Sequence, residues 1–359
     1  MLNGIAQLNF GVDDLAKATR FIDDFGLPLV EKQEAHSLYR LAEGSFVSLR
    51  HIDDPAVPKS DLVGAGVQEV IWGCDTKDSF NRYADRLART LSITEVASGT
   101  IHFVAPFGQA MGLRFQPRIP VVSSPSPVNT PGQTNRFNQW RKWRRRAEPK
   151  QIMHSVFRYP DVNAALDFFR GTLDFRISEV QKGIGVYLRC SGTSQHHVIA
   201  LLDATVPFIG NGTMQYDHTN FIVEDIDELM IGKAYMERQG WEKSPQGIGR
   251  HRIGSALYVY MPSPLGGDIE YGADADQIDD TWVPHVWSGD FGFRTWMHNP
   301  PPFMMHEPEW DLAELPDPHT ARHQSMAELI SSGAIKAPAP ADHNMDMKAG
   351  SESHAEAAE

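Results

Sequence analysis

Two histidines and one glutamate in the second half of the chain have the residue types and the relative positions needed to bind a metal ion. His154 and His218 occupy the same position in two copies of a repeated sequence unit, and Glu270 lies in the closing strand expected for the later copy. Two imidazoles and one carboxylate, with no cysteine nearby, match a mononuclear non-haem Fe(II) site that keeps open positions for further ligands. We therefore predict that His154, His218 and Glu270 are metal ligands.

The repeat becomes visible when the chain is aligned with itself. Residues 154–161 and residues 218–225 each read as a short alternating strand that ends in an acidic helix-capping residue, followed by the apolar pattern of an amphipathic helix. Residues 7–13 and residues 68–75 have the same layout. Four copies of one strand–helix–strands unit predict an α+β fold of four βαβββ modules, which we expect to pair into two open barrel-like domains.

The two early copies have glutamine, Gln7 and Gln68, where the two late copies have histidine. Glutamine can satisfy a buried polar position, but its amide is a poorer ligand for a transition metal than imidazole. The scaffold therefore does not itself require histidine at this position. We predict that the first half of the chain binds no metal.

Length and composition set the class of protein. The chain has 359 residues, of which 41% are hydrophobic, and this is enough for two ordinary cores. A formal net charge of -13 argues against a nucleic-acid-binding surface. The only cysteines, Cys74 and Cys190, offer no disulfide framework. With no basic-then-apolar leader and no stretch long enough to span a bilayer, we expect a soluble, cytoplasmic protein.

Composition shifts divide the chain into four parts. Residues 1–120 are predicted to form the metal-free N-terminal domain of two modules, and residues 150–300 the catalytic C-terminal domain of two modules. Between them, residues 121–149 are predicted to be a linker, rich in Pro and Ser at first and basic afterwards. We interpret this basic run as a solvated connector that pairs with an acidic protein. Residues 301–359 form a C-terminal extension whose Ala/Pro/acidic end is expected to be mobile.

The second half also resembles a known family. Residues 251–272 contain a histidine, a strand that ends in tyrosine, a Pro/Ser/Gly turn and a glutamate before Tyr-Gly. This pattern is similar to that of the type I extradiol ring-cleaving dioxygenases of the vicinal oxygen chelate superfamily, which cleave catechols and dihydroxybiphenyls. The resemblance covers about residues 1–300.

The resemblance implies that His154, His218 and Glu270 hold Fe(II). It implies an enzyme of aromatic catabolism that inserts both atoms of O2 into a catechol-type vicinal diol and cleaves the ring adjacent to the hydroxyls. The implied partners are this aromatic substrate, O2 and further copies of the chain in a homo-oligomer, with no nucleic acid and no membrane.

The resemblance assigns roles to three further residues. His197, which precedes a short apolar run, takes the position of the acid–base histidine, and His251 and Tyr260 take those of hydrogen-bonding groups for the catecholate or bound oxygen. One departure concerns residues 253–255, which are Ile-Gly-Ser where the family often has Asn-Asp-His. The resemblance is therefore weakest for the residues that surround the ligands and for the choice of substrate.

Three classes of function remain open from the sequence. The first is the Fe(II) extradiol dioxygenase; the second is another metal-dependent enzyme of the same scaffold, such as a glyoxalase-like isomerase or a lyase; the third is a non-catalytic small-molecule-binding protein. The set of His197, His251 and Tyr260 favours the first class, because a binding protein does not need acid–base groups around an open metal. The aromatic stretch of residues 282–296 is expected to pack over the barrel, either as pocket lining or as core.

Overall fold

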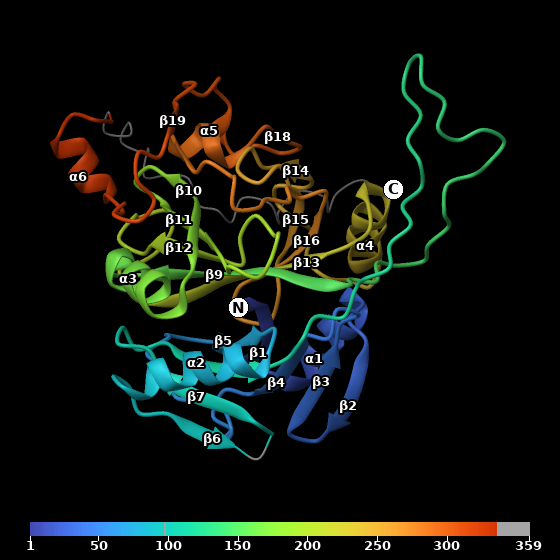
Figure 1. Cartoon of the computed structure of the whole chain (residues 1–359). Helices are drawn as coiled ribbons and strands as arrows, with labels where there is room; N and C mark the ends of the chain where they lie inside the picture. The colour runs from blue at the N-terminus through green and yellow to red at the C-terminus, as the bar shows by residue number, and fades with distance from the viewer. Residues whose placement is uncertain (97, 336–359) are drawn as a thin grey trace, which may run out of the picture.

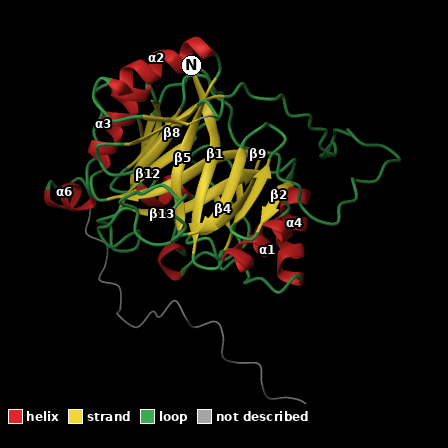
Figure 2. Cartoon of the chain, turned by 90° about the horizontal axis from the view of Figure 1, so that it is seen from below, coloured by secondary structure: helices red, strands yellow, loops and turns green. Residues whose placement is uncertain are grey.

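The computed structural model describes residues 1–96 and 98–335, which form two large β-sheets with the helices at their periphery (Figures 1 and 2). The end of the C-terminal extension, which was expected to be mobile, lies outside the described residues. Within the described part of the chain, every helix is too short or too polar to cross a lipid bilayer.

The first half contains two modules with the same order of elements. The first module consists of β1 (Leu2–Val12), α1 (Leu15–Phe25), β2 (Leu29–Gln33), β3 (His36–Arg40) and β4 (Phe46–His51). The second consists of β5 (Gly66–Cys74), α2 (Lys77–Ala88), β6 (Thr94–Val96), β7 (Thr100–Val104) and β8 (Ala110–Phe115). Their strands form an eight-stranded sheet in the order β2-β3-β4-β1-β5-β8-β7-β6.

The second half repeats this plan. The third module consists of β9 (Gln151–Tyr159), α3 (Val162–Leu173), β10 (Arg176–Gln181), β11 (Gly185–Arg189) and β12 (Ile199–Asp203). The fourth consists of β13 (Gln215–Ile222), α4 (Ile226–Arg238), β14 (Gly249–Arg250), β15 (Leu257–Met261) and β16 (Asp268–Ala273). The predicted α+β class and the four βαβββ modules are therefore confirmed. The grouping of the modules into two separate domains stays a prediction.

Capping residues begin each module helix. In the late modules the caps are the predicted acids, because Asp161 accepts a hydrogen bond from the backbone of Ala164 and Asp225 accepts one from Glu228. In the early modules each cap lies one residue later than the predicted acid, at Asp14 and Thr76. Each helix thus begins directly after a residue with an extended backbone whose side chain accepts a hydrogen bond from a backbone N–H of the first turn.

The first strands of paired modules lie side by side in the middle of each sheet. In the second half, β13 pairs antiparallel with β9 and parallel with β16. The register sets Asn220 of β13 opposite His154 on one side and opposite Glu270 on the other. These three neighbouring strands therefore bring His154, His218 and Glu270 into one region of the sheet.

The chain after the fourth module joins the two ends of the second sheet. Its elements are β17 (His285–Trp287), α5 (Gly289–Phe293), β18 (Trp296–Met297), η1 (Pro302–Met304), β19 (Leu312–Glu314) and α6 (Met326–Ser331). β17 pairs with β10 near one end of the sheet, and β18 pairs with β14 at the other end. The segment between them therefore links the two ends of the sheet, at the top of the second half in Figure 1. Its packing over a barrel stays a prediction.

The two halves pack against each other through a shared apolar core. Phe25 stacks on Tyr271 with ring centroids 3.8 Å apart, and Trp72 packs edge-on against Phe175 at 4.9 Å. All four side chains are buried. Aromatic pairs of this kind add to the free energy gained from buried area alone. The first half therefore supports the strands that carry the predicted ligands.

Candidate metal centre

The three predicted ligands converge on one point inside the second half. His154 lies in β9, His218 in β13 and Glu270 in β16. The Nε2 atoms of the two histidines are 3.3 Å apart, and each lies 3.4 Å from Oε2 of Glu270. Their exposed fractions are only 4%, 9% and 0%. In the part of the chain that the structure describes, they form the one group of metal-ligating side chains with such spacing.

The donor set fits a metal ion. Neither carboxylate oxygen of Glu270 makes a hydrogen bond with any described residue, although both oxygens are fully buried. A buried carboxylate without partners costs several kcal/mol, so such groups are normally paired or bound to a metal. A nearly equilateral triangle of donor atoms also suits an ion with ligand distances of about 2.0–2.2 Å.

The charge states of Glu270 and His154 favour the form of each group that binds a cation. Burial alone would raise the pKa of Glu270, but the neighbouring His154 and His218 lower it below the usual carboxyl value. Burial lowers the pKa of His154, despite the opposing effect of Glu270. Glu270 is therefore held as a carboxylate and His154 as a neutral imidazole.

Asp217 supports His218 from the side away from the ligand atoms. Its Oδ1 lies 2.5 Å from Nδ1 of His218, and its Oδ2 accepts hydrogen bonds of 2.6 Å from Arg158. A carboxylate bound to the second ring nitrogen fixes the tautomer of a metal-binding histidine. Burial lowers the pKa of His218, but the hydrogen bond and charge of Asp217 outweigh burial and raise it. Sequence analysis missed Asp217, because alternation along a regular strand predicts that its side chain and that of His218 point to opposite faces.

His197 lies next to the ligand triangle. Its ring stacks on that of His154, with centroids 4.3 Å apart and planes 21° apart. Its Nδ1 is 3.0 Å from Nδ1 of His196, and its Nε2 makes no hydrogen bond with the described residues. Burial lowers the pKa of His197 well below its usual value, and the nearby His154 and His196 lower it further. The ring is therefore neutral, with Nε2 available for proton exchange.

His251 and Tyr260 form a hydrogen-bonded pair next to the ligands. Nδ1 of His251 lies 2.7 Å from the carbonyl of Phe293, and its Nε2 lies 3.2 Å from the hydroxyl of Tyr260. Burial lowers the pKa of His251 to about 4, so the ring is neutral near pH 7. Its Nδ1 therefore donates to the carbonyl and its Nε2 accepts from Tyr260. The Tyr260 ring meets His218 edge-on at 5.0 Å, which places this pair beside the predicted metal ligands.

The segment that departs from the family pattern supports His196. Gly254 has a φ of +71°, and a Cβ atom there would come within 3.1 Å of His196 Nδ1. Only glycine readily adopts this backbone conformation at so close an approach. On the other side of His196, the indole of Trp282 packs edge-on at 5.9 Å. Ile253-Gly254-Ser255 thus leaves room for His196, which in turn contacts His197.

Among the described residues of the early modules, no cluster of His, Cys, Asp and Glu has the ligand spacing of this centre. Gln7 donates a hydrogen bond of 2.6 Å to Asn9, and Gln68 donates one of 3.0 Å to the carbonyl of Gly64. Both amides therefore have ordinary polar partners, in keeping with the contrast between glutamine and histidine seen in the sequence.

Relatives with known names support the resemblance. No family model matches the chain. A metapyrocatechase of Cupriavidus necator is 26% identical over 309 residues, which cover 83% of this chain and 90% of that protein. An iron-dependent extradiol dioxygenase of Rhodococcus jostii is 28% identical over 159 residues, which cover 38% of this chain and 50% of that protein.

Solved structures show the same fold. A halotolerant catechol dioxygenase superimposes with a TM-score of 0.64 at 19% identity, over 88% of this chain and 99% of the other. A Mn(II)-bound glyoxalase from Novosphingobium aromaticivorans also superimposes with a TM-score of 0.64, at 18% identity, over 91% of this chain and 98% of the other. The predicted resemblance and the predicted class of enzyme are confirmed: the chain is a homologue of the extradiol ring-cleaving dioxygenases and has the vicinal oxygen chelate fold.

Proposed function

We propose that the chain is an Fe(II)-dependent extradiol dioxygenase that cleaves a catechol-type vicinal diol with O2. The observation that carries this proposal is the buried Glu270 carboxylate, which has no hydrogen-bond partner among the described residues and lies 3.4 Å from two histidine Nε2 atoms. Two imidazoles and one carboxylate on one side of an ion form the ligand set typical of non-haem Fe(II) oxygenases. The names of the relatives agree with this chemistry.

His154, His218 and Glu270 would hold the ion. A bound Fe(II) would supply Lewis-acid chemistry that lowers the pKa of the substrate hydroxyls, together with redox chemistry towards O2. Two neutral imidazoles and one carboxylate leave a net positive charge on the loaded site, which favours an anionic diol. Asp217 would keep Nδ1 of His218 protonated, so that its Nε2 stays available to the ion.

His197 would move the proton. Because its ring is neutral and its Nδ1 contacts Nδ1 of His196, one proton is shared along this contact. With the proton on Nδ1 of His197, its Nε2 accepts a proton from a substrate hydroxyl; with the proton on Nδ1 of His196, Nε2 of His197 carries a proton to donate. A positioned acid–base group of this kind contributes about 10²–10⁴-fold to a rate.

Tyr260 and His251 would orient the substrate. Burial, together with the charge of Glu270, raises the pKa of Tyr260 well above its usual value, so its hydroxyl stays protonated and acts as a donor. This hydroxyl donates to Nε2 of His251 at 3.2 Å. A catecholate oxygen beside the ion would offer this donor a stronger, charged acceptor.

Oxygen uptake after anaerobic loading tests the proposal. Metal-free protein receives Fe(II) or Mn(II) without oxygen, then catechol, 3-methylcatechol or biphenyl-2,3-diol, and air is admitted last. We expect a yellow ring-fission product, one O2 consumed per diol, and no product from Glu270→Ala treated in the same way. An Fe(II)-loaded protein that binds these diols without consuming O2 would refute the proposal. If such a protein isomerised a thiol adduct of a ketoaldehyde, the glyoxalase-like alternative would replace it.

A further inference from the structure

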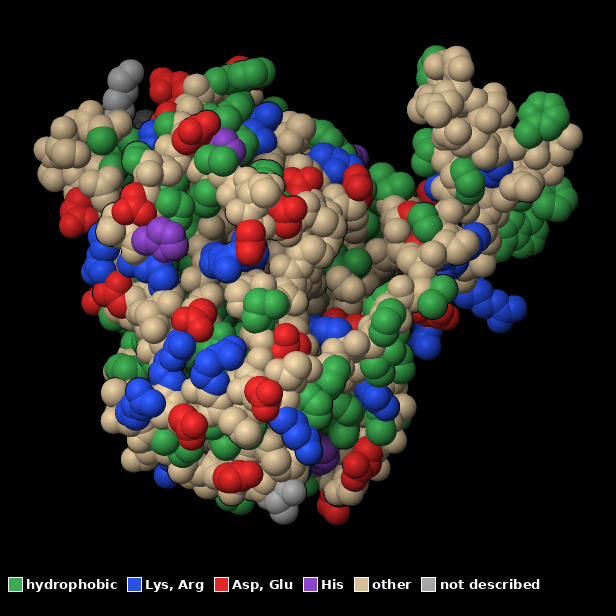
Figure 3. Space-filling view, in the orientation of Figure 1, with side chains coloured by type: hydrophobic (Ala, Val, Ile, Leu, Met, Phe, Trp, Pro, Cys, Tyr) green, Lys and Arg blue, Asp and Glu red, His purple; other side chains and the backbone are tan. Residues whose placement is uncertain are grey.

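The segment between the two halves projects from the body of the molecule. Residues 121–149, here called the arm, contain no helix or strand and only an isolated bridge between Thr130 and Gln133. The arm leaves the body beside α4 and stands clear of it, with apolar side chains gathered along its outer part (Figures 1 and 3). It contains six basic residues and one acidic residue, whereas the whole chain has a net charge of -13.

Ion pairs fix the root of the arm to α4 and to the loop before it. Arg141 pairs with Asp227, Lys142 pairs with Glu224 at 2.8 Å, and Arg144 pairs with Glu224 and, at 3.4 Å, with Glu228. This confirms the interpretation that the basic run pairs with acidic groups of its own chain. The root is therefore held in one position, and its cations are largely neutralised.

Hydrogen bonds within the arm also fix its outer part. Asn129 accepts hydrogen bonds from the backbone of Asn135 and Arg136, and it donates one of 2.8 Å to the carbonyl of Arg136. The guanidinium of Arg136 donates to the carbonyl of Pro127 at 2.7 Å. The arm thus has a defined shape at both ends, and little conformational entropy remains to be lost when it binds a partner.

Three large aromatic side chains of the arm are exposed to solvent. Phe137 is 75% exposed, and Trp140 and Trp143 are each 87% exposed. The two indoles lie close together, with ring centroids 6.4 Å apart. Clustered exposed aromatic residues mark interaction sites, and Trp and Arg are enriched among the residues that dominate binding energy.

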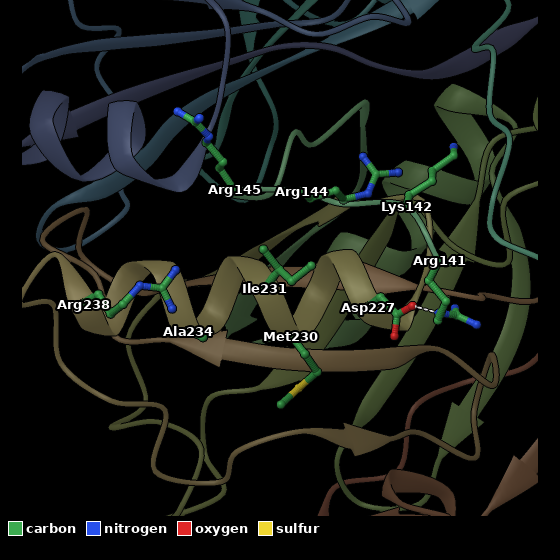
Figure 4. A pocket seen from close by; sticks show the side chains of 9 residues that line it. All are labelled: Arg141, Lys142, Arg144, Arg145, Asp227, Met230, Ile231, Ala234 and Arg238. Atoms are coloured by element: carbon green, nitrogen blue, oxygen red, sulfur yellow. Dashed lines mark hydrogen bonds and ion pairs between the residues drawn. The ribbon is translucent and has the colours of Figure 1, made fainter. Parts of the chain in front are cut away.

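A groove that fits an indole lies between the root of the arm and α4. It has a volume of about 420 Å³, and Figure 4 shows its two walls. Met230, Ile231 and Ala234 of α4 offer apolar side chains, and Arg141, Arg144 and Arg238 line it with guanidinium groups. Met230 is 38% exposed. A tryptophan ring matches this lining because its apolar area packs on the α4 side chains and its face attracts guanidinium groups.

We propose that the arm is a dimerisation element: Trp140 and Trp143 of one chain insert into the groove between the arm and α4 of a second copy. Each chain carries both the two tryptophans and the groove. A twofold axis can therefore place the tryptophans of each chain in the groove of the other, which makes two identical contacts. The lining of the groove favours this occupant, because the guanidinium groups of Arg141, Arg144 and Arg238 attract the faces of indoles, and the same chain leaves two indoles exposed. The proposal does not depend on the reaction at the metal centre.

Sedimentation of the full chain over a range of micromolar concentrations tests this proposal. We expect the unmodified protein to be a dimer, and Trp140→Ser with Trp143→Ser to raise its dissociation constant by about 30-fold or more. Met230→Glu, which puts a charge into the groove, should have a similar effect. Val30→Ser is the control, because Val30 is a 56% exposed apolar residue of β2 that belongs to neither the arm nor the groove. Far-UV circular dichroism and thermal unfolding verify that each variant is folded.

Each outcome bears on the proposal. A monomeric unmodified protein would overturn it, and so would a dimer that survives loss of both tryptophans. A dimer lost with the tryptophans but kept in Met230→Glu would exclude the groove as the receiving surface. A monomer that binds vesicles of anionic phospholipid through the same tryptophans would identify a membrane, rather than a second copy, as the partner.

Discussion

Replacing Asp217 by asparagine should weaken Fe(II) binding although Asp217 is not one of the predicted ligands. The carboxylate accepts the proton on Nδ1 of His218 at 2.5 Å and is itself held by Arg158 at 2.6 Å. An asparagine amide held by the same arginine would present its NH2 group to Nδ1. His218 would then favour the tautomer that carries its proton on Nε2, which blocks the atom that faces Glu270.

The expected size of the effect follows from the behaviour of such supporting residues. Loss of an outer partner of a metal ligand typically costs about 10–100-fold in metal affinity or activity. In free energy of binding this is about 1.4–2.7 kcal/mol. We expect Asp217→Asn to fall in this range and to leave the fold intact, because neither its size nor its backbone is changed.

Anaerobic titration of Fe(II) against a competing chelator measures the change. Asp268→Asn is the control, because Asp268 also lies near His218 but its carboxylate makes no hydrogen bond with the described residues. If the supporting hydrogen bond matters, Asp217→Asn loses affinity and Asp268→Asn changes little. Equal losses in the two variants would mean that only negative charge is required. Unchanged affinity in Asp217→Asn would refute the assignment of His218 as a ligand oriented by Asp217.

Four further changes follow from the same structure. Glu270→Ala should abolish iron retention, measured as iron per chain after gel filtration, because it removes the one anionic donor. His197→Phe should keep iron and the ring stack on His154 but slow turnover by about 10² or more; full activity at every pH would contradict the acid–base role. Because the pKa of His218 is raised, a proton competes with Fe(II) for this histidine. The Fe(II) affinity should therefore reach its full value above that pKa and fall as the pH drops through it; an affinity that does not change with pH would contradict this. Phe157→Ala, at a fully buried site, should lower the free energy of unfolding in urea by about 3–5 kcal/mol, and a change below 1 kcal/mol would mean that the cavity collapses.

The repeated unit is what made the fold and the ligand cluster predictable. Equivalent positions in β9 and β13 have the same neighbours in the sheet, so one alignment of the chain with itself places His154 beside His218. The hairpin of β15 and β16 then brings Glu270 next to β13. These contacts follow from local patterns and one repeat.

Contacts made by irregular backbone could not be predicted in this way. The pairing of β13 with β9 shifts between Tyr216 and His218, and this irregularity lies at Asp217. Alternation along a regular strand would have pointed neighbouring side chains to opposite faces. Likewise, the contact of His196 with His197 depends on the left-handed turn at Gly254. The position of the root of the arm depends on ion pairs between residues that are 80 or more positions apart in the sequence.

Anomalous diffraction at the iron absorption edge, from crystals of the Fe(II)-loaded protein, tests the central claim most directly. We expect one strong peak per chain, about 2.0–2.2 Å from Nε2 of His154, Nε2 of His218 and a carboxylate oxygen of Glu270. A peak elsewhere in the molecule, or iron bound without one of these three side chains, would contradict the account.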